Sequence, residues 1–138
     1  MYLWELWSYC SKSGGKVTVF EIPFRLPSLN DYIKEINKNR YGGNEHKQSV
    51  EDDILWFLKK VKTKISKPVR LKFIWYEQNK NRDKDNVAFA KKYILDALQK
   101  AEILPNDNNQ YIDGFQDDFV YKQGDKVVVE IMEAEYEG

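Results

Sequence analysis

Hydrophobic residues along this chain alternate in some segments and recur at helical spacing in others. In the segment 69–76, Val69, Leu71 and Phe73 alternate with Arg70 and Lys72, which is the two-residue period of a strand. In the segment 86–101, apolar residues recur every three or four positions, as on a helix with one buried face. Such patterns predict strands over 16–23, 69–76, 115–121 and 126–133, and helices over 29–36, 49–65 and 86–101.

Capping and turn-forming residues separate these elements. Ser28 or Asn30 can cap the first helix and Ser49 the second, while the polar segment 37–47, with its paired glycines, is expected to be a flexible basic loop. A turn at Gly124 is expected to join the last two strands into an antiparallel hairpin. The order strand, helix, helix, strand, helix, strand, strand predicts an α+β domain in which helices pack on a mixed β-sheet.

The length of 138 residues suits one domain, which we assign to 16–138, preceded by an N-terminal extension over 1–15. The apolar segment 1–10 is interrupted by Glu5, follows no basic run and is too short to span a bilayer, so neither a signal peptide nor a membrane partner is expected. It can be an extra strand, an amphipathic segment packed on a neighbouring subunit, or a partly ordered extension.

Cysteine content and charge narrow the possible chemistry. Cys10 is the one cysteine and His46 the one histidine, which excludes an internal disulfide, argues against a zinc site and suits a reducing, cytoplasmic environment. The net charge is zero, but residues 102–138 hold ten acids and two bases, whereas residues 1–101 hold 12 acids and 20 bases. This asymmetry is compatible with a basic surface for a polyanion beside an acidic patch for a cation.

Candidate metal-binding carboxylates lie on both sides of the helix predicted over 86–101. Asp83 and Asp85 are two residues apart, so in an extended segment they point to the same side and can share a cation. Asp107 follows the helix and can complete a three-carboxylate site. Oxygen ligands of this kind suit Mg²⁺ or Mn²⁺, which can activate water for phosphodiester hydrolysis. The alternative is structural, because Asp85 or Asn86 immediately before the helix can be its N-cap, and Asp107 among asparagines can be part of a turn.

A family resemblance favours the metal site. The chain resembles the RusA family of Holliday-junction resolvases in an arginine-led D-x-D-N, a helix containing D-A-L, a following K-A, an acidic loop, and a segment that leads into the last strands. These residues are Arg82-Asp83-Lys84-Asp85-Asn86, Asp96-Ala97-Leu98, Lys100-Ala101, Asn106-Asp107 and Gln110-Tyr111-Ile112-Asp113. The order of elements matches over 17–133, and the specific residues match only over 82–113.

The resemblance implies a homodimeric, Mg²⁺- or Mn²⁺-dependent endodeoxyribonuclease that cuts four-way DNA junctions in recombination and repair, encoded by a bacterium or a phage. Its three aspartates fall on Asp83, Asp85 and Asp107. The family's lysine usually stands four residues after the second aspartate, where this chain has Phe89 and three additional residues before D-A-L. Alignment from Asp96 gives Lys92 as the catalytic lysine, with Lys91 as the alternative.

Basic residues near these positions are candidates for contacts with DNA phosphates, which position DNA without reading its sequence. A solvated basic face is the alternative for each of them. Two other functions stay open: a non-catalytic DNA-binding relative of the same fold, and an interaction module whose acids only cap and turn. The predicted DNA-binding residues are Arg82, Lys84, Lys91, Lys38 and Arg40.

Overall fold

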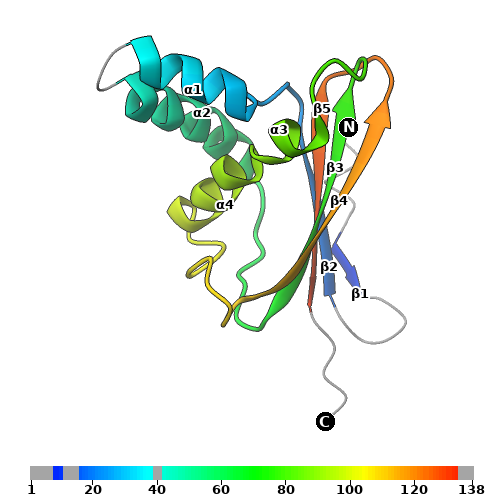
Figure 1. Ribbon diagram of the computed structural model, residues 1–138. Coiled ribbons are helices and arrows are strands. Elements are labelled where there is room, and N and C mark those ends of the chain that lie inside the picture. Colours follow the sequence, from blue (N-terminus) through cyan, green and yellow to red (C-terminus); the bar gives the residue numbers. More distant parts are fainter. Residues whose placement is uncertain (1–7, 11–15, 39–41, 134–138) are drawn as a thin grey trace.

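The computed structural model describes residues 8–10, 16–38 and 42–133, and it confirms a single small α+β domain with a mixed sheet. In Figure 1 the helices gather on one side of the sheet. Their bounds, with those of the strands, are β1 Ser8–Cys10, β2 Lys16–Ile22, α1 Leu29–Lys38, α2 Gly42–Leu58, β3 Val69–Glu77, α3 Lys84–Ala88, α4 Lys91–Lys100, β4 Ile112–Tyr121 and β5 Lys126–Glu133.

The strand order is β1-β2-β5-β3-β4, with β3 antiparallel to β5 and parallel to β4. The predicted hairpin of the last two strands is therefore wrong, because β3 lies between them. Leu71, Phe73 and Trp75 of β3 are at most 2% exposed. A strand with neighbours on both edges buries more apolar surface than an edge strand, which favours the position of β3 between β4 and β5. The turn at Gly124 is nevertheless present, and its φ of 106° is one that glycine adopts without strain.

The main core lies between the sheet and the helices. Phe73 and Trp75 stack with their ring centroids 5.6 Å apart, and Tyr93, Ile94 and Leu98 of α4 are buried in the same cluster. Each large apolar side chain buried in this way contributes about 1.5–3 kcal/mol. The core therefore fixes α4 against β3, and with it the segments that precede and follow this helix.

Helix α2 begins earlier than the sequence predicts. Residues 42–47, expected to belong to a basic loop, form its first turns, and Ser49 lies inside the helix rather than at its N-cap. The two glycines fall at the helix start, where fewer backbone hydrogen bonds depend on them. The predicted end at residue 65 is also wrong, because α2 ends at Leu58, and Ile65 is buried in the connection to β3, where its N–H donates to Ile103 O at 2.8 Å.

The long helix predicted over 86–101 is interrupted. It consists of α3 and α4, separated at Phe89 and Ala90, where Ala90 N–H bonds to Val87 O and Tyr93 N–H to Ala90 O, three residues back in each case. This tight turn packs Ala90, 1% exposed, into the core. The prediction of a continuous helix is therefore wrong at this point, and the interruption changes where the following side chains lie.

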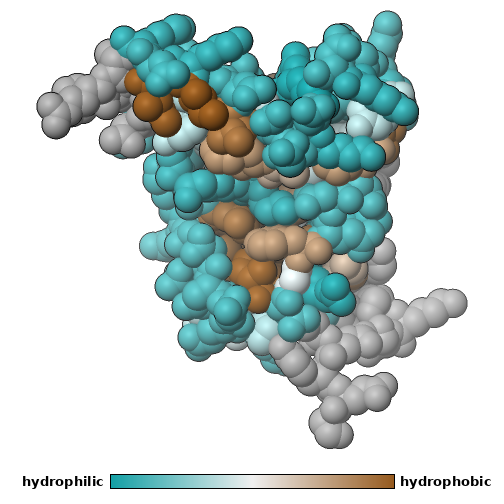
Figure 2. Space-filling model, in the orientation of Figure 1, coloured by the Kyte–Doolittle hydropathy of each residue, from teal (hydrophilic) through white to brown (hydrophobic). Residues whose placement is uncertain are grey.

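At the N-terminus, Ser8–Cys10 forms β1 and pairs antiparallel with β2, which bears out the extra-strand alternative for these residues. The rest of the predicted extension over 1–15 lies outside the described residues. None of the helices in the described part of the chain is long and apolar enough to cross a membrane. Figure 2 shows that the face drawn in Figure 1 is mostly hydrophilic, with apolar side chains gathered in one area toward the α1–α2 end and in another near the middle of the face.

Candidate functional site

Asp83 stands at the N-cap position of α3, and Asp85 lies in the first turn of this helix. Asp83 occupies the N-cap position with an extended backbone (φ −67°, ψ 150°), yet its side chain makes no capping hydrogen bond. Both side chains are exposed, and within the described ranges neither forms a hydrogen bond or an ion pair. The capping alternative therefore does not account for these two carboxylates, which are free to accept a ligand.

Asp107 lies in the loop after α4, where neighbouring asparagines make the turn. The Asn106 side chain accepts the Asp107 N–H at 2.8 Å, and the Asn108 side chain accepts the Gln110 N–H at 3.0 Å. The Asp107 carboxylate is exposed and has no partner among the residues that the structure describes. Like Asp83 and Asp85, it is not needed for the local backbone structure.

A single chain does not bring Asp107 to the other two aspartates. The Val69 N–H donates to Tyr111 O at 2.8 Å, which holds the Asp107 loop beside the first residue of β3, whereas Asp83 follows the last. A nine-residue strand is about 30 Å long, and in Figure 1 the loop after α4 lies toward the lower end of the strands, whereas α3 lies beside their upper part. Within the described residues no three His, Cys, Asp or Glu side chains form a group that could hold a metal. The expected three-carboxylate site is therefore not formed within one chain.

Two lysines extend from the helices over β4. The Lys84 ammonium lies 5.7 Å from the centre of the Phe119 ring, and the Lys91 ammonium lies 4.6 Å from the centre of the Phe115 ring. Phe115 and Phe119 are four residues apart on β4 and so share one face. Lys92, predicted as the catalytic lysine, is exposed, while the Lys91 side chain is 19% exposed. The structure therefore places Lys84 and Lys91, rather than Lys92, over the same face of β4.

Asp117, between the two phenylalanines, was not predicted as a site residue. Its Oδ2 lies 2.7 Å from Lys91 Nζ, and its Oδ1 accepts a hydrogen bond of 2.9 Å from Trp75 Nε1. One feature of the sequence indicates that Asp117 is unusual. It is a charged residue on the strand face that it shares with Phe115 and Phe119, where an apolar residue is expected. The partners themselves depend on the parallel pairing of β3 with β4, which the sequence pattern did not predict.

Arg82 precedes the two free aspartates but is engaged in the fold. Its Nε and Nη2 lie 2.7 and 2.8 Å from the two carboxylate oxygens of Glu77, which is 5% exposed, and its Nη1 donates to Leu26 O at 3.1 Å. Its predicted contact with DNA phosphate would therefore compete with these partners. Lys38 pairs with Glu35 at 3.1 Å, and Arg40 lies outside the described residues.

Ser28 and Asp31 begin α1 with a reciprocal cap beside Arg82. Asp31 Oδ2 accepts the Ser28 N–H at 2.9 Å, and Ser28 Oγ accepts the Asp31 N–H at 3.3 Å. Burial raises the pKa of Asp31, but the two hydrogen bonds with Ser28 and the charges of Arg82 and Arg25 outweigh it and lower the pKa below 3.8. The cap thus confirms Ser28, one of the two alternatives from the sequence, as the start of α1.

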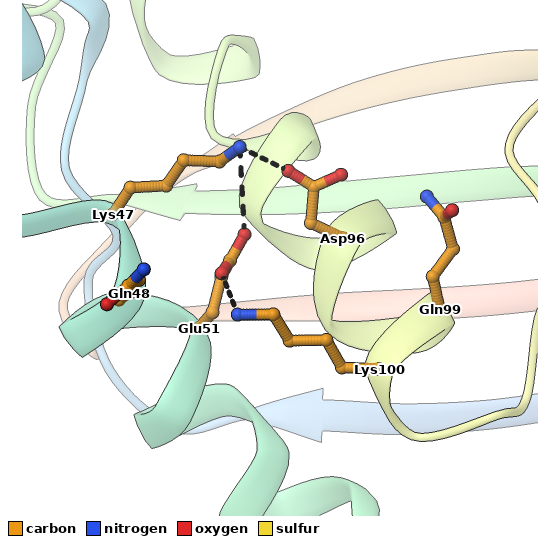
Figure 3. Close-up of a pocket in the computed structure, with 6 residues that line it drawn as sticks. All are labelled: Lys47, Gln48, Glu51, Asp96, Gln99 and Lys100. Atoms are coloured by element: carbon orange, nitrogen blue, oxygen red, sulfur yellow. Dashed lines mark hydrogen bonds and ion pairs between the residues drawn. The ribbon is translucent and has the colours of Figure 1, made fainter. Parts of the chain in front are cut away.

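A second charged cluster lines a pocket between α2 and α4 (Figure 3). Glu51, 3% exposed, pairs with Lys100 at 2.5 Å and with Lys47 at 3.9 Å, and Lys47 also lies 2.8 Å from Asp96. The hydrogen bond with Asp96 raises the pKa of Lys47 above 10.5 despite its partial burial. Since each of these charges has an opposite partner, we interpret the cluster as a link between the two helices rather than as a binding site.

Comparison with models of protein families finds no match, and none of the curated proteins matches the chain. The chemistry of the site is therefore inferred from the residues of this chain. The carboxylates of Asp83 and Asp85, which have no partner among the described residues, supply oxygen ligands for a hard divalent cation, and Lys84 of α3 and Lys91 of α4 supply positive charge for an anion.

Proposed function

We propose that this chain is a metal-dependent, structure-specific endodeoxyribonuclease that hydrolyses phosphodiesters at four-way junctions or related branched DNA, in recombination and repair. The observation that carries the proposal is the pair Asp83 and Asp85, two exposed carboxylates at the start of α3 that neither cap the helix nor pair with a cation among the described residues. The resemblance to the RusA family, which rests on the same residues, supports it.

The donor set fits Mg²⁺ or Mn²⁺, which take a few carboxylates together with water and phosphate oxygens. When bound, such an ion supplies an activated water and stabilises negative charge on the phosphate. Asp83 and Asp85 would hold the ion, while the lysine of the site, Lys91 or Lys92, would contact a phosphate oxygen and stabilise the charge that develops there. Lys84 adds a second positive charge beside the same aspartates.

We further propose that a homodimer completes the site. Each chain carries Asp83 and Asp85 beyond the end of β3 and the Asp107 loop beside its beginning, and the three carboxylates have no partner among the described residues. A twofold axis can place the Asp107 loop of one subunit against α3 of the other, which gives two equivalent composite sites. Two such sites suit a substrate with twofold symmetry, such as a four-way junction cut on opposing strands.

The first test is cleavage of a synthetic four-way junction in Mg²⁺, Mn²⁺ or EDTA. We expect paired nicks that require the metal and are lost in Asp85→Asn. Asp113→Asn is the matched control, because Asp113 is also an exposed aspartate without a partner in the described residues. Tight junction binding without cuts would instead indicate the alternative, a non-catalytic DNA-binding relative. Absence of binding at low salt would rule out both.

The composite site is tested by mixing two inactive variants, Asp85→Asn and Asp107→Asn. In their heterodimer, one site carries both substitutions and the other carries neither. If Asp107 acts across the dimer, mixing restores nicking at one strand of the junction. If all three aspartates act within one chain, both sites stay defective and no nicking returns.

A further inference from the structure

The ion pair of Lys91 and Asp117 joins the start of α4 to β4. Lys91 Nζ lies 2.7 Å from Asp117 Oδ2, and the two side chains are 19% and 25% exposed. The other oxygen of Asp117 accepts the indole N–H of Trp75, whose ring is buried in the core at 2% exposure. Both carboxylate oxygens therefore have a fixed partner, and one of these partners belongs to the rigid centre of the sheet.

Aromatic rings confine the same ammonium group. Lys91 Nζ lies 4.6 Å from the centre of the Phe115 ring and 5.4 Å from that of Phe73. Contacts of a cation with ring faces are attractive and directional. Together with Asp117, these rings give the Lys91 ammonium a defined position over β4, which a lysine on an open helix surface does not have.

The next ion pair along β4 provides a comparison. Lys72 Nζ lies 3.3 Å from Asp118 Oδ2, but Asp118 is adjacent to Asp117 and so points to the opposite face of the sheet, away from α3 and α4. Its side chain is 46% exposed. The two pairs therefore share their chemistry and their strand, and differ in the face of the sheet on which they lie.

The interruption between α3 and α4 bears on the choice between Lys91 and Lys92. The alignment from Asp96 that gives Lys92 runs along the helix predicted to be continuous over 86–101. The chain instead turns tightly at Phe89 and Ala90, and α4 begins at Lys91 itself. As a result the side chain of Lys91 lies over the same face of β4 as the side chain of Lys84 from α3. Lys92, in contrast, is exposed.

We infer that Asp117 is a positioning residue that, held by Trp75, orients Lys91 as the lysine of the nuclease site. The inference rests on the proposed function and deepens it. In this arrangement the Lys91 ammonium contacts an oxygen of the scissile phosphate, while Asp117 and Trp75 touch neither DNA nor metal. Removing a group that orients a metal ligand typically costs about 10- to 100-fold in activity, and we expect a loss of similar size for Asp117.

The test compares Asp117→Asn with Asp118→Asn on a four-way junction at saturating Mg²⁺. Asparagine keeps the size of Asp117 and an oxygen for Trp75, but it loses the charge that holds Lys91. We expect Asp117→Asn to lower kcat by about 10-fold or more with little change in KM, and Asp118→Asn to leave kcat within about twofold. Thermal melting of both variants checks that they are folded.

Lysine variants complete the design. We expect Lys91→Met to lower kcat by about 100-fold or more and Lys92→Met to have a small effect. The double variant of Asp117→Asn with Lys91→Met should be no slower than Lys91→Met alone, because the two residues act through one group. Trp75→Phe, which keeps an aromatic ring in the core but removes the N–H donor, should reproduce part of the Asp117→Asn effect.

The outcomes separate this inference from the proposed function. If the wild type cuts the junction but Asp117→Asn behaves like Asp118→Asn, or Lys92→Met is the slow variant, the role of Asp117 and Lys91 is refuted and the nuclease stands. Additive losses in the double variant would refute it as well. A wild type that binds junctions without cutting them in either metal refutes the nuclease and this role together.

Discussion

Replacing Arg82 should destabilise the fold strongly, although the sequence presents it as a DNA contact. Its guanidinium binds both oxygens of Glu77 at 2.7 and 2.8 Å, and the two side chains are only 14% and 7% exposed. Arg82→Met keeps much of the apolar stem but leaves the Glu77 carboxylate buried with one distant partner, Arg25 at 4.0 Å. Removing one member of a buried ion pair costs about 3–5 kcal/mol.

We expect a loss near the lower end, about 3 kcal/mol, because Arg25 retains part of the compensating charge. For a domain of this length, such a loss corresponds to a fall in melting temperature of about 10 °C. Urea unfolding monitored by circular dichroism measures the free energy directly. Arg25→Met is the matched control: it removes the same charge from the same carboxylate, but Arg25 is 51% exposed, so we expect less than about 1 kcal/mol.

A second variant separates the buried charge from other effects of losing Arg82. Adding Glu77→Leu to Arg82→Met removes the unpaired carboxylate, so most of the lost stability should return. Equal, small losses for Arg82→Met and Arg25→Met would refute the reasoning. So would an Arg82→Met chain that unfolds like the wild type but no longer binds junction DNA, since Arg82 would then be a DNA contact that the fold does not need.

Two further predictions concern stability. Ser28→Ala removes the hydroxyl that caps α1, so it should lower the free energy of unfolding by about 0.5–2 kcal/mol in urea titrations; no loss would mean that the cap is dispensable. The pKa of Lys47 is raised above 10.5 in the fold, so its pairing with Asp96 contributes stability that is complete below pH 10.5 and is lost as pH rises through the folded pKa. Melting curves should therefore show Asp96→Asn less stable than the wild type at neutral pH and the difference shrinking above pH 10.5, whereas a pH-independent difference would contradict this.

Local patterns predicted most individual elements correctly. The alternation around Phe73 identified β3, and Ser28 identified the start of α1, because both signals depend on neighbours close in the chain. The pairing of the last two strands was predicted wrongly. A turn at Gly124 favours a hairpin of the two strands that it joins, and the prediction did not consider that β3 could lie between them. In the structure β3 pairs with both β4 and β5 and so separates them, and this pairing joins residues far apart in the chain.

The candidate site was predicted in part for the same reason. Asp83, Asp85 and Asp107 follow from short motifs, and their carboxylates are indeed free of structural partners in the described chain. The separation of Asp107 from the other two depends on where β3 begins and ends in space, which spacing in the sequence does not reveal. Asp117 was missed because its partners come from β3 and α4, 42 and 26 residues away in the chain.

Strand β3 also fixes how far apart two parts of the molecule can be. It is hydrogen-bonded on both sides, to β5 and β4, and it connects the region of the Asp107 loop directly to the approach to Asp83. Its pairing with β4 is regular from Arg70 to Glu77, after one register shift between Val69 and Arg70, so the span is set by the number of residues in the strand. Lengthening β3 by two residues would move one region by about 7 Å and keep every side chain on its own face, whereas adding one residue would turn the buried face outward.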